Sequence, residues 1–173
     1  MLKPTISLLL ATGIVAAACT IGSGIPRTLE PTGSMLAMVA PASGVQVYEC
    51  RIRQGDIDAF EWAFVAPDAK LYDQDGKEIG THGAGPVWIA NDGSRVMGKL
   101  VARADSPISG SIPWLLLAAT STGPAGRFSA VTSIQRVNTL GGTAPSKPCN
   151  LESLGKKAGV HYTADYRFFI QKH

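Results

Sequence analysis

The C-terminal segment of the chain, residues 160–170, places apolar side chains at every second position. The side chains between them are polar for most of the segment. Because successive side chains of a β-strand point to opposite faces, this pattern predicts a strand with one face in the core. The residues expected to point inward are Val160, Tyr162, Ala164, Tyr166, Phe168 and Ile170.

Further strands are expected throughout the chain after residue 44. Residues 45–53 form one such segment, in which Tyr48, Cys50 and Ile52 share a face. The turn-rich sequence 73–76 predicts a hairpin. Further strand segments are expected around residues 60–64, 86–90, 94–103 and 128–138, and a helical turn or two is expected within 151–157. The uncharged run 112–119 suits a central strand that is covered on both faces.

Composition agrees with this pattern, because 19 glycines, 11 prolines and a charged fraction of only 17% favour strands and turns over helices. About eight or nine mostly antiparallel strands predict an all-β, single-domain β-sandwich or closed β-barrel.

The N-terminus has the features of an export signal. Lys3 precedes an uncharged apolar stretch that is too short to span a bilayer, and small residues end it at Ala18. Residues 16–19 resemble a bacterial lipobox, in which Cys19 would become the lipidated N-terminus; ordinary cleavage without a lipid is the alternative. We therefore expect a signal peptide over 1–18, a flexible tether over 19–41 and a β domain over 42–173.

Two cysteines remain in the body of the domain, Cys50 and Cys149. An oxidising envelope compartment favours a disulfide between them. The bond would close a loop of roughly 100 residues, which the chain-entropy model equates with about 4–5 kcal/mol at its upper end. A zinc site is the competing interpretation, and these cysteines lack the paired spacing that it usually requires.

The segment 81–88 is the most distinctive candidate for a site. Its glycines and proline allow a sharp turn that brings His82 close to Trp88, and a histidine beside an aromatic ring suits a ligand pocket or a proton-transfer site. The alternative is a structural turn in which His82 caps a carbonyl group. Arg136 has two possible roles, either holding a ligand carboxylate or pairing with an internal aspartate. The predicted ligand-binding residues are His82, Trp88, Trp114, Gln135 and Arg136.

Other chemistries find little support in the sequence. No two histidines have metal-ligand spacing, and neither a nucleophile elbow nor a nucleotide-binding glycine motif occurs. The net charge of +3, to which the leader residue Lys3 contributes, is too small to indicate nucleic-acid binding. We therefore expect no catalytic residues, no metal and no cofactor.

Several segments together resemble a known family. They are residues 44–50, 62–67, 82–88, 92–94, 112–117 and 131–137, followed by Gly141-Gly142, Cys149 and the closing strand 162–169. This set is similar to the bacterial and fungal family catalogued as domain of unknown function 3455, over about residues 41–170. The resemblance implies a secreted or envelope-attached protein and no established activity. The chain departs from the family pattern at Gly83, Val87 and Ile89, where the family carries aromatic, threonine or acidic residues. The dehydrogenase labels of some fungal members do not fit a chain without a nucleotide fingerprint.

The leading hypothesis is an exported, lipid-anchored protein of the bacterial cell envelope that binds a small molecule, a glycan or a partner protein without catalysis. Its location would be membrane-anchored, periplasmic or secreted, and the lipid bilayer would be its partner through the N-terminal acyl group. The alternative function is an extracytoplasmic hydrolase with His82 as general base.

Overall fold

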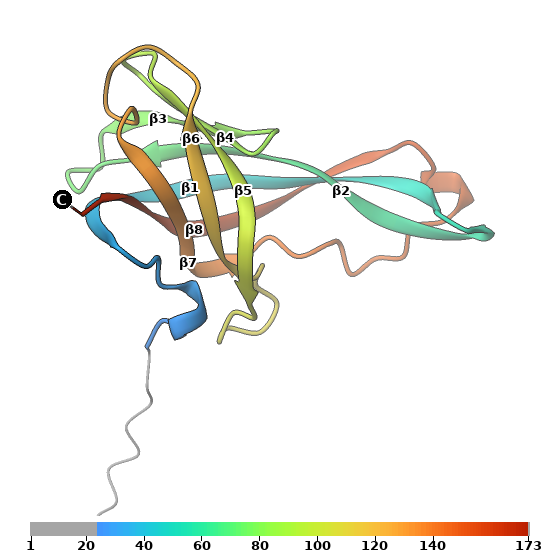
Figure 1. Ribbon diagram of the computed structural model, residues 1–173. Helices are drawn as coiled ribbons and strands as arrows, with labels where there is room; N and C mark the ends of the chain where they lie inside the picture. Colours follow the sequence, from blue (N-terminus) through green and yellow to red (C-terminus); the bar gives the residue numbers. More distant parts are fainter. Residues whose placement is uncertain (1–23, 173) are drawn as a thin grey trace, which may run out of the picture.

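Eight antiparallel strands, hydrogen-bonded in the order of the sequence, close into a barrel in the computed structural model, which describes residues 24–172 (Figure 1). The strands are β1 (Ser34–Arg53), β2 (Asp56–Tyr72), β3 (Glu78–Gly83), β4 (Val87–Ala90), β5 (Arg95–Ala104), β6 (Trp114–Ser121), β7 (Val131–Gly141) and β8 (Lys157–Gln171). Two 3-10 turns, η1 (Arg27–Leu29) and η2 (Leu151–Ser153), complete the described elements. The all-β prediction is confirmed, and of its two forms the closed barrel is the one observed.

Closure depends on the pairing of the last strand with the first. β8 runs antiparallel to β1 from the pair Ser34–Gln171 to the pair Glu49–Lys157. The alternation expected for β8 is confirmed at its centre, where Tyr162, Ala164, Tyr166 and Phe168 are buried. Since both edges of the sheet are joined in this way, the barrel has no free edge along the β1–β8 seam.

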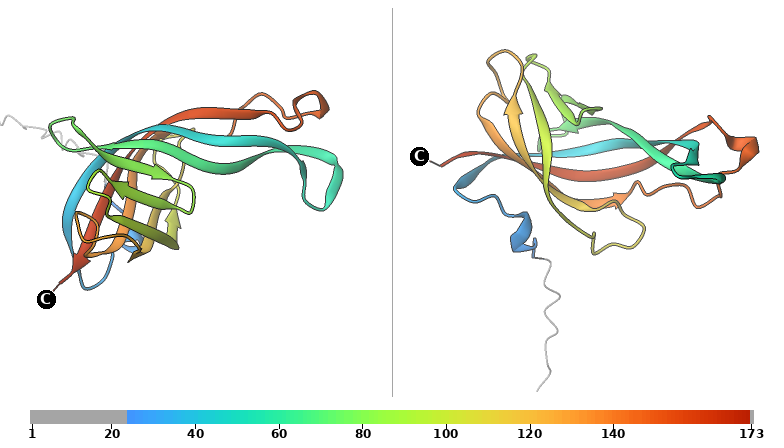
Figure 2. Two further views of the ribbon diagram at one scale, coloured as in Figure 1. Left: turned by 90° about the horizontal axis from the view of Figure 1, so that it is seen from above. Right: turned by 45° about the vertical axis from the view of Figure 1, so that its right-hand side comes forward.

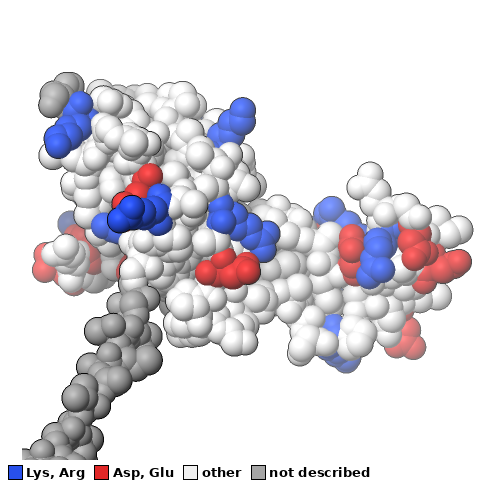
Figure 3. Space-filling model, turned by 60° about the horizontal axis from the view of Figure 1, so that its bottom comes forward, with Lys and Arg blue, Asp and Glu red and all other residues white. Residues whose placement is uncertain are grey.

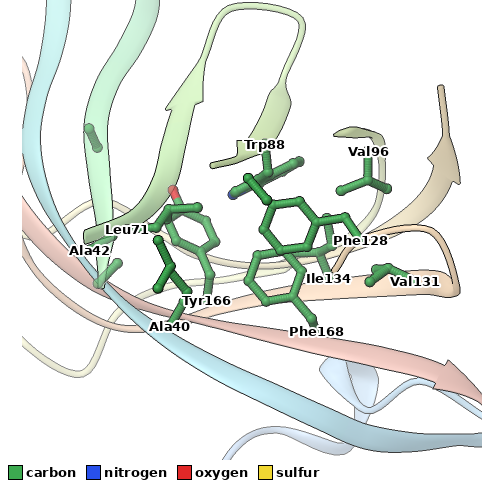
Figure 4. Close-up of a cluster of buried hydrophobic side chains, with 14 of the residues drawn as sticks. Ala40, Ala42, Leu71, Trp88, Val96, Phe128, Val131, Ile134, Tyr166 and Phe168 are labelled. Atoms are coloured by element: carbon green, nitrogen blue, oxygen red, sulfur yellow. The ribbon is translucent and has the colours of Figure 1, made fainter. Parts of the chain in front are cut away.

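Packed side chains fill the barrel interior at one of its two ends. This closed end carries the β2–β3, β4–β5 and β6–β7 connections, and Phe128 of the last of these stacks on Phe168 with a centroid distance of 4.7 Å. Figure 4 shows both rings in the cluster that also holds Trp88, Tyr166 and Ile134. Gly98 is required beside this cluster, because a Cβ there would lie 2.9 Å from the Trp88 ring.

The opposite end extends into an arm, defined here as residues 48–66 of the β1–β2 hairpin together with residues 143–161 (Figure 2). The Cys50–Cys149 disulfide ties the two parts of the arm, with a Cα–Cα distance of 5.5 Å. The Trp62 indole N–H also donates to the Lys147 carbonyl oxygen at 2.9 Å. Cys50 is fully buried, as its expected inward face requires. The disulfide indicates an oxidising, extracytoplasmic compartment.

Charged residues of both signs gather at the far end of the arm (Figure 3). Arg51 pairs with Glu49, and Arg53 pairs with Glu61. These side chains keep between a quarter and a half of their surface in contact with solvent, so the pairs contribute little to stability.

The structure corrects the expected boundary between tether and domain. β1 begins at Ser34, and Leu29 before it is fully buried, so residues 24–41 are part of the folded domain. Leu29 packs on the outer face of the barrel against Trp114, Leu116 and Val137. The predicted signal peptide and Cys19 lie outside the described residues.

This N-terminal segment explains why the run 112–119 is apolar on both faces. Leu117 of β6 belongs to the interior core, whereas Trp114 and Leu116 belong to the outer cluster with Leu29. The prediction of a strand covered on both faces is therefore confirmed. Within residues 24–172, none of the helical segments is long and apolar enough to cross a membrane.

Two large apolar side chains on the strands are half-exposed. Phe64 and Leu100 leave 52% and 56% of their surfaces exposed. Phe64 lies in the arm, beyond the closed part of the barrel, and the β5–β6 register shifts between Leu100 and Ala102. Such a bulge interrupts the regular alternation of side chains beside it.

Candidate functional site

A cavity of about 520 Å³ opens at the end of the barrel from which the arm extends. Its walls come from the arm and β2, the β3–β4 hairpin, the end of β5, the start of β6, and inward residues of β1, β7 and β8. The apolar and aromatic lining residues include Tyr48, Phe64, Pro67, Trp88, Leu100, Ile112, Leu115, Leu117 and Tyr166. Because Phe128 fills the closed end, the cavity is a pocket with one mouth and not a channel.

His82 and Trp88 form part of the inner wall. They are direct partners across the β3–β4 hairpin, and their rings stack with a centroid distance of 4.2 Å and an interplanar angle of 9°. Tyr166 meets the histidine ring edge-on at 4.9 Å. The prediction that the turn at residues 83–86 brings His82 close to Trp88 is confirmed.

The protonation state of His82 follows from its surroundings. Its Nδ1 donates to the carbonyl oxygen of Val87 at 2.9 Å, so Nε2 is left with a lone pair. Burial lowers the pKa of His82 to about 4; the Val87 hydrogen bond opposes this shift and the positive charge of Arg136 adds to it. The ring is therefore neutral at neutral pH, and the capping role that we weighed as the structural alternative is present.

Arg136 reaches the cavity from β7. Its Nε and Nη2 both donate to the Pro113 carbonyl oxygen, at 3.1 and 2.9 Å, which fixes the guanidinium plane at the wall. None of the ion pairs among the described residues includes Arg136, and no aspartate or glutamate lines the cavity. Of the two roles expected for Arg136, the pairing with an internal aspartate is not observed.

Two buried donors in the cavity wall lack a hydrogen-bond partner among the described residues. They are the side-chain amide nitrogen of Gln46 and the indole nitrogen of Trp88. Both residues line the cavity, and both are almost completely buried. Native structures leave few such groups unsatisfied, so each one calls for an explanation.

Trp114 and Gln135, which we had placed with the site, lie elsewhere. Neither lines the cavity. Trp114 packs in the outer cluster, and the Gln135 amide donates to the Leu29 carbonyl oxygen at 2.6 Å while accepting from Arg167. The physical reason is the pleat of the strand: Gln135 points outward because its neighbour Arg136 points into the barrel.

Several cavity residues were not predicted from the sequence, although the sequence pattern could have indicated some of them. Gln46 sits two positions before Tyr48 on the same strand, so its polar side chain falls on an inward face. A polar residue at a core position is informative in this way. Pro113 and Arg103 had no such signal, because they contribute through the position of the β5–β6 connection.

The geometry does not favour the general-base role proposed for His82. Within the part of the chain described, its one hydrogen bond goes to a backbone carbonyl, and its closest ring contacts are aromatic. Residues 24–172 also hold no group of three or more histidine, cysteine, aspartate or glutamate side chains placed to bind a metal ion.

Comparison with known families decides the affiliation of the chain. A family model described as "Protein of unknown function (DUF3455)" matches residues 31–170. The chain belongs to the DUF3455 family. The DUF3455 match includes every strand of the barrel apart from the last residue of β8, together with both parts of the arm. The comparison with curated proteins found no match to the chain.

Proposed function

We propose that this DUF3455 protein is an extracytoplasmic ligand-binding barrel that takes up one small, mainly apolar molecule in the cavity at its open end. The observation that carries the proposal is the contrast between the two ends of the barrel. Phe128 fills one end, whereas the other leaves about 520 Å³ lined mostly by apolar side chains. Small-molecule sites typically occupy about 300–1,000 Å³, and eight-stranded barrels are wide enough to hold one small ligand.

The lining favours a small molecule over the glycan or protein partner that the sequence left open. A sugar presents many hydroxyl groups that need hydrogen-bond partners, and this wall offers few polar groups. A protein partner needs a broad surface, typically about 800 Å² on each side, and the cavity is concave and narrow.

The envelope location and the acyl anchor at Cys19 form part of the same proposal. The disulfide supports an oxidising compartment. The leader features and the small residues before Cys19 support export and lipidation.

Binding of N-phenyl-1-naphthylamine, an uncharged apolar dye that brightens when it leaves water, tests the proposal. We expect saturable binding with one site per barrel. Leu100→Trp should weaken binding at least several-fold, because Leu100 lines the mouth and is half-exposed, so that a larger ring there obstructs entry without disturbing the core.

The matched control is Val101→Trp on the same strand. Val101 is 61% exposed and does not line the cavity, so this variant should bind the dye as the wild type does. Absence of saturable binding to the wild type, or equal binding by both variants, would contradict the proposal.

A further inference from the structure

The cavity holds one buried positive charge without a counter-charge. Arg136 is partly buried, its guanidinium is held in place by the Pro113 carbonyl, and no acidic side chain lines the cavity. A charge removed from water is costly unless it is paired. The effect of Arg136 extends across the cavity, since its charge lowers the pKa of Tyr48 and Tyr166 against the larger, opposite effect of burial, and adds to burial in lowering the pKa of His82.

The two donors without a partner, on Gln46 and Trp88, also favour a ligand group that accepts hydrogen bonds. The Trp88 indole N–H has no hydrogen-bond partner among residues 24–172, and the Gln46 amide N–H has none of ordinary geometry there, its nearest acceptor being the Tyr162 hydroxyl. A buried donor without an acceptor costs about 1–3 kcal/mol. Together with Arg136 they supply donors from β1, β4 and β7, so the polar part of the cavity is suited to a group that accepts hydrogen bonds and carries negative charge.

The remainder of the lining is apolar. Side chains such as Ile112, Leu115 and Leu117 offer no hydrogen bonds and favour a hydrocarbon or aromatic body. Within the cavity the requirement is for a single negative charge, because Arg136 is its one partly buried cation; Arg103, the other cation in the lining, is exposed to solvent. A carboxylate meets it with one charge in a planar group, whereas a phosphate at neutral pH carries more charge than Arg136 alone neutralises.

We propose that the ligand of this cavity is an amphipathic carboxylic acid, whose carboxylate binds Arg136 and whose apolar body lies against the barrel interior. This inference rests on the proposed function and specifies its ligand class. Gln46 and Trp88 are the neutral donors available to the same head group.

Displacement of N-phenyl-1-naphthylamine by three ligands of equal chain length tests the inference at neutral pH. The competitors are decanoate, decanol and decyl phosphate. For the wild type we expect decanoate to compete at least tenfold better than decanol, as a charge-assisted hydrogen bond predicts, and better than decyl phosphate.

Arg136→Gln should lower the affinity for decanoate about tenfold or more and leave that for decanol unchanged. Lys99→Gln is the matched control, because it removes an exposed positive charge of β5 outside the cavity. This variant should behave as the wild type does. Retained decanol binding also shows that Arg136→Gln is folded.

Gln46→Leu provides a second route that does not depend on Arg136→Gln folding. It removes a buried donor without a partner and keeps a similar volume, so the ligand-free protein should unfold at a higher urea concentration. The stabilisation that decanoate gives should become smaller, because one donor to the head group is gone.

Equal competition by decanoate and decanol on the wild type, with the dye still bound, would overturn the carboxylate inference and leave the proposed function intact. A preference for decyl phosphate would overturn the ligand class. An equal loss of decanoate and decanol in Arg136→Gln, with Gln46→Leu less stable than the wild type, would assign both residues to structure alone. No dye binding at all would contradict the proposed function itself.

Discussion

His82 combines two roles at the scale of a single residue, as a wall of the cavity and as part of the packed interior. Its stacking on Trp88 and its hydrogen bond to Val87 fix the ring, and burial keeps it neutral. A neutral buried histidine makes the fold sensitive to acid, because the unfolded chain takes up a proton that the folded chain resists.

We predict that the stability of the protein falls as pH decreases from 6.5 towards 4. The folded pKa of His82 is lowered from 6.5 to about 4, so its contribution is complete above pH 6.5 and is lost progressively down to the folded pKa. The loss reaches roughly 3 kcal/mol at most. Urea unfolding at pH values across this window should show a shallower dependence for His82→Phe, which keeps an aromatic ring beside Trp88.

His161→Phe is the control, since His161 is exposed on β8 and its loss should leave the wild-type dependence in place. The Asp92 carboxylate affects the stability of the fold only at lower pH. Hydrogen bonds from Ser94 and the Arg127 backbone lower its pKa to about 2, so it stays charged throughout this window. An unchanged slope in His82→Phe would count against the neutral buried state.

The site was only partly predictable from single residues. The turn glycines and proline around His82 and Trp88 predicted their pairing, because a short hairpin fixes which residues face each other. Arg136 was identified from its type, but its partner Pro113 is distant in sequence and was not. Trp114 and Gln135 were misplaced because an apolar or amide side chain does not reveal which face of its strand is the interior.

Among the secondary-structure elements, too, some features were predictable from the sequence and others were not. Alternation predicted β8, and the apolar run predicted β6, because both patterns are local. The choice between barrel and sandwich depends on the pairing of β8 with β1, which joins segments from opposite ends of the domain and has no local signature. The N-terminal segment was misjudged because Ile25 and Leu29 are isolated apolar residues among Pro, Thr and Gly, and their binding surface on β6 and β7 is visible only in the fold.

We predict that Leu29→Ala destabilises the domain by about 2–4 kcal/mol, since it removes a fully buried side chain from the outer cluster. Leu140→Ala is the matched control, because Leu140 is 55% exposed and its truncation should cost at most about 0.5 kcal/mol. Urea unfolding of both variants measures the difference. Equal effects of the two substitutions would show that residues 24–33 are a linker and not part of the folded domain.

At the scale of the whole molecule, the barrel, the arm and the N-terminal segment form one folded unit, whose arm is cross-linked by the Cys50–Cys149 disulfide. The unit places its cavity mouth beside the arm, while its N-terminal segment leaves from the outer face near β6 and β7. The proposed acyl group at Cys19 would set the position of the molecule in the cell.

We predict that the wild type fractionates with membranes when it is produced in a bacterium, and that Cys19→Ser is recovered in the soluble fraction. The reason is that an acyl group at Cys19 would supply the membrane affinity, since hydrocarbon chains bind bilayers by about 0.8 kcal/mol per buried methylene. An intact Cys50–Cys149 bond in both proteins, detected by mass spectrometry without reduction, confirms that each was exported and folded. Recovery of the wild type in the soluble fraction would rule out the anchor.

The docking of Ile25 and Leu29 on the barrel limits how far an acylated molecule can move from its membrane. The few residues between Cys19 and Ile25 reach at most ~20 Å when fully extended, at about 3.3–3.6 Å each. With the proposed acyl group at Cys19, a connection this short would hold the barrel against the headgroup layer. The cavity would then sample molecules dissolved in the leaflet by a search over a surface, and its occupancy would depend on their density per unit of membrane area.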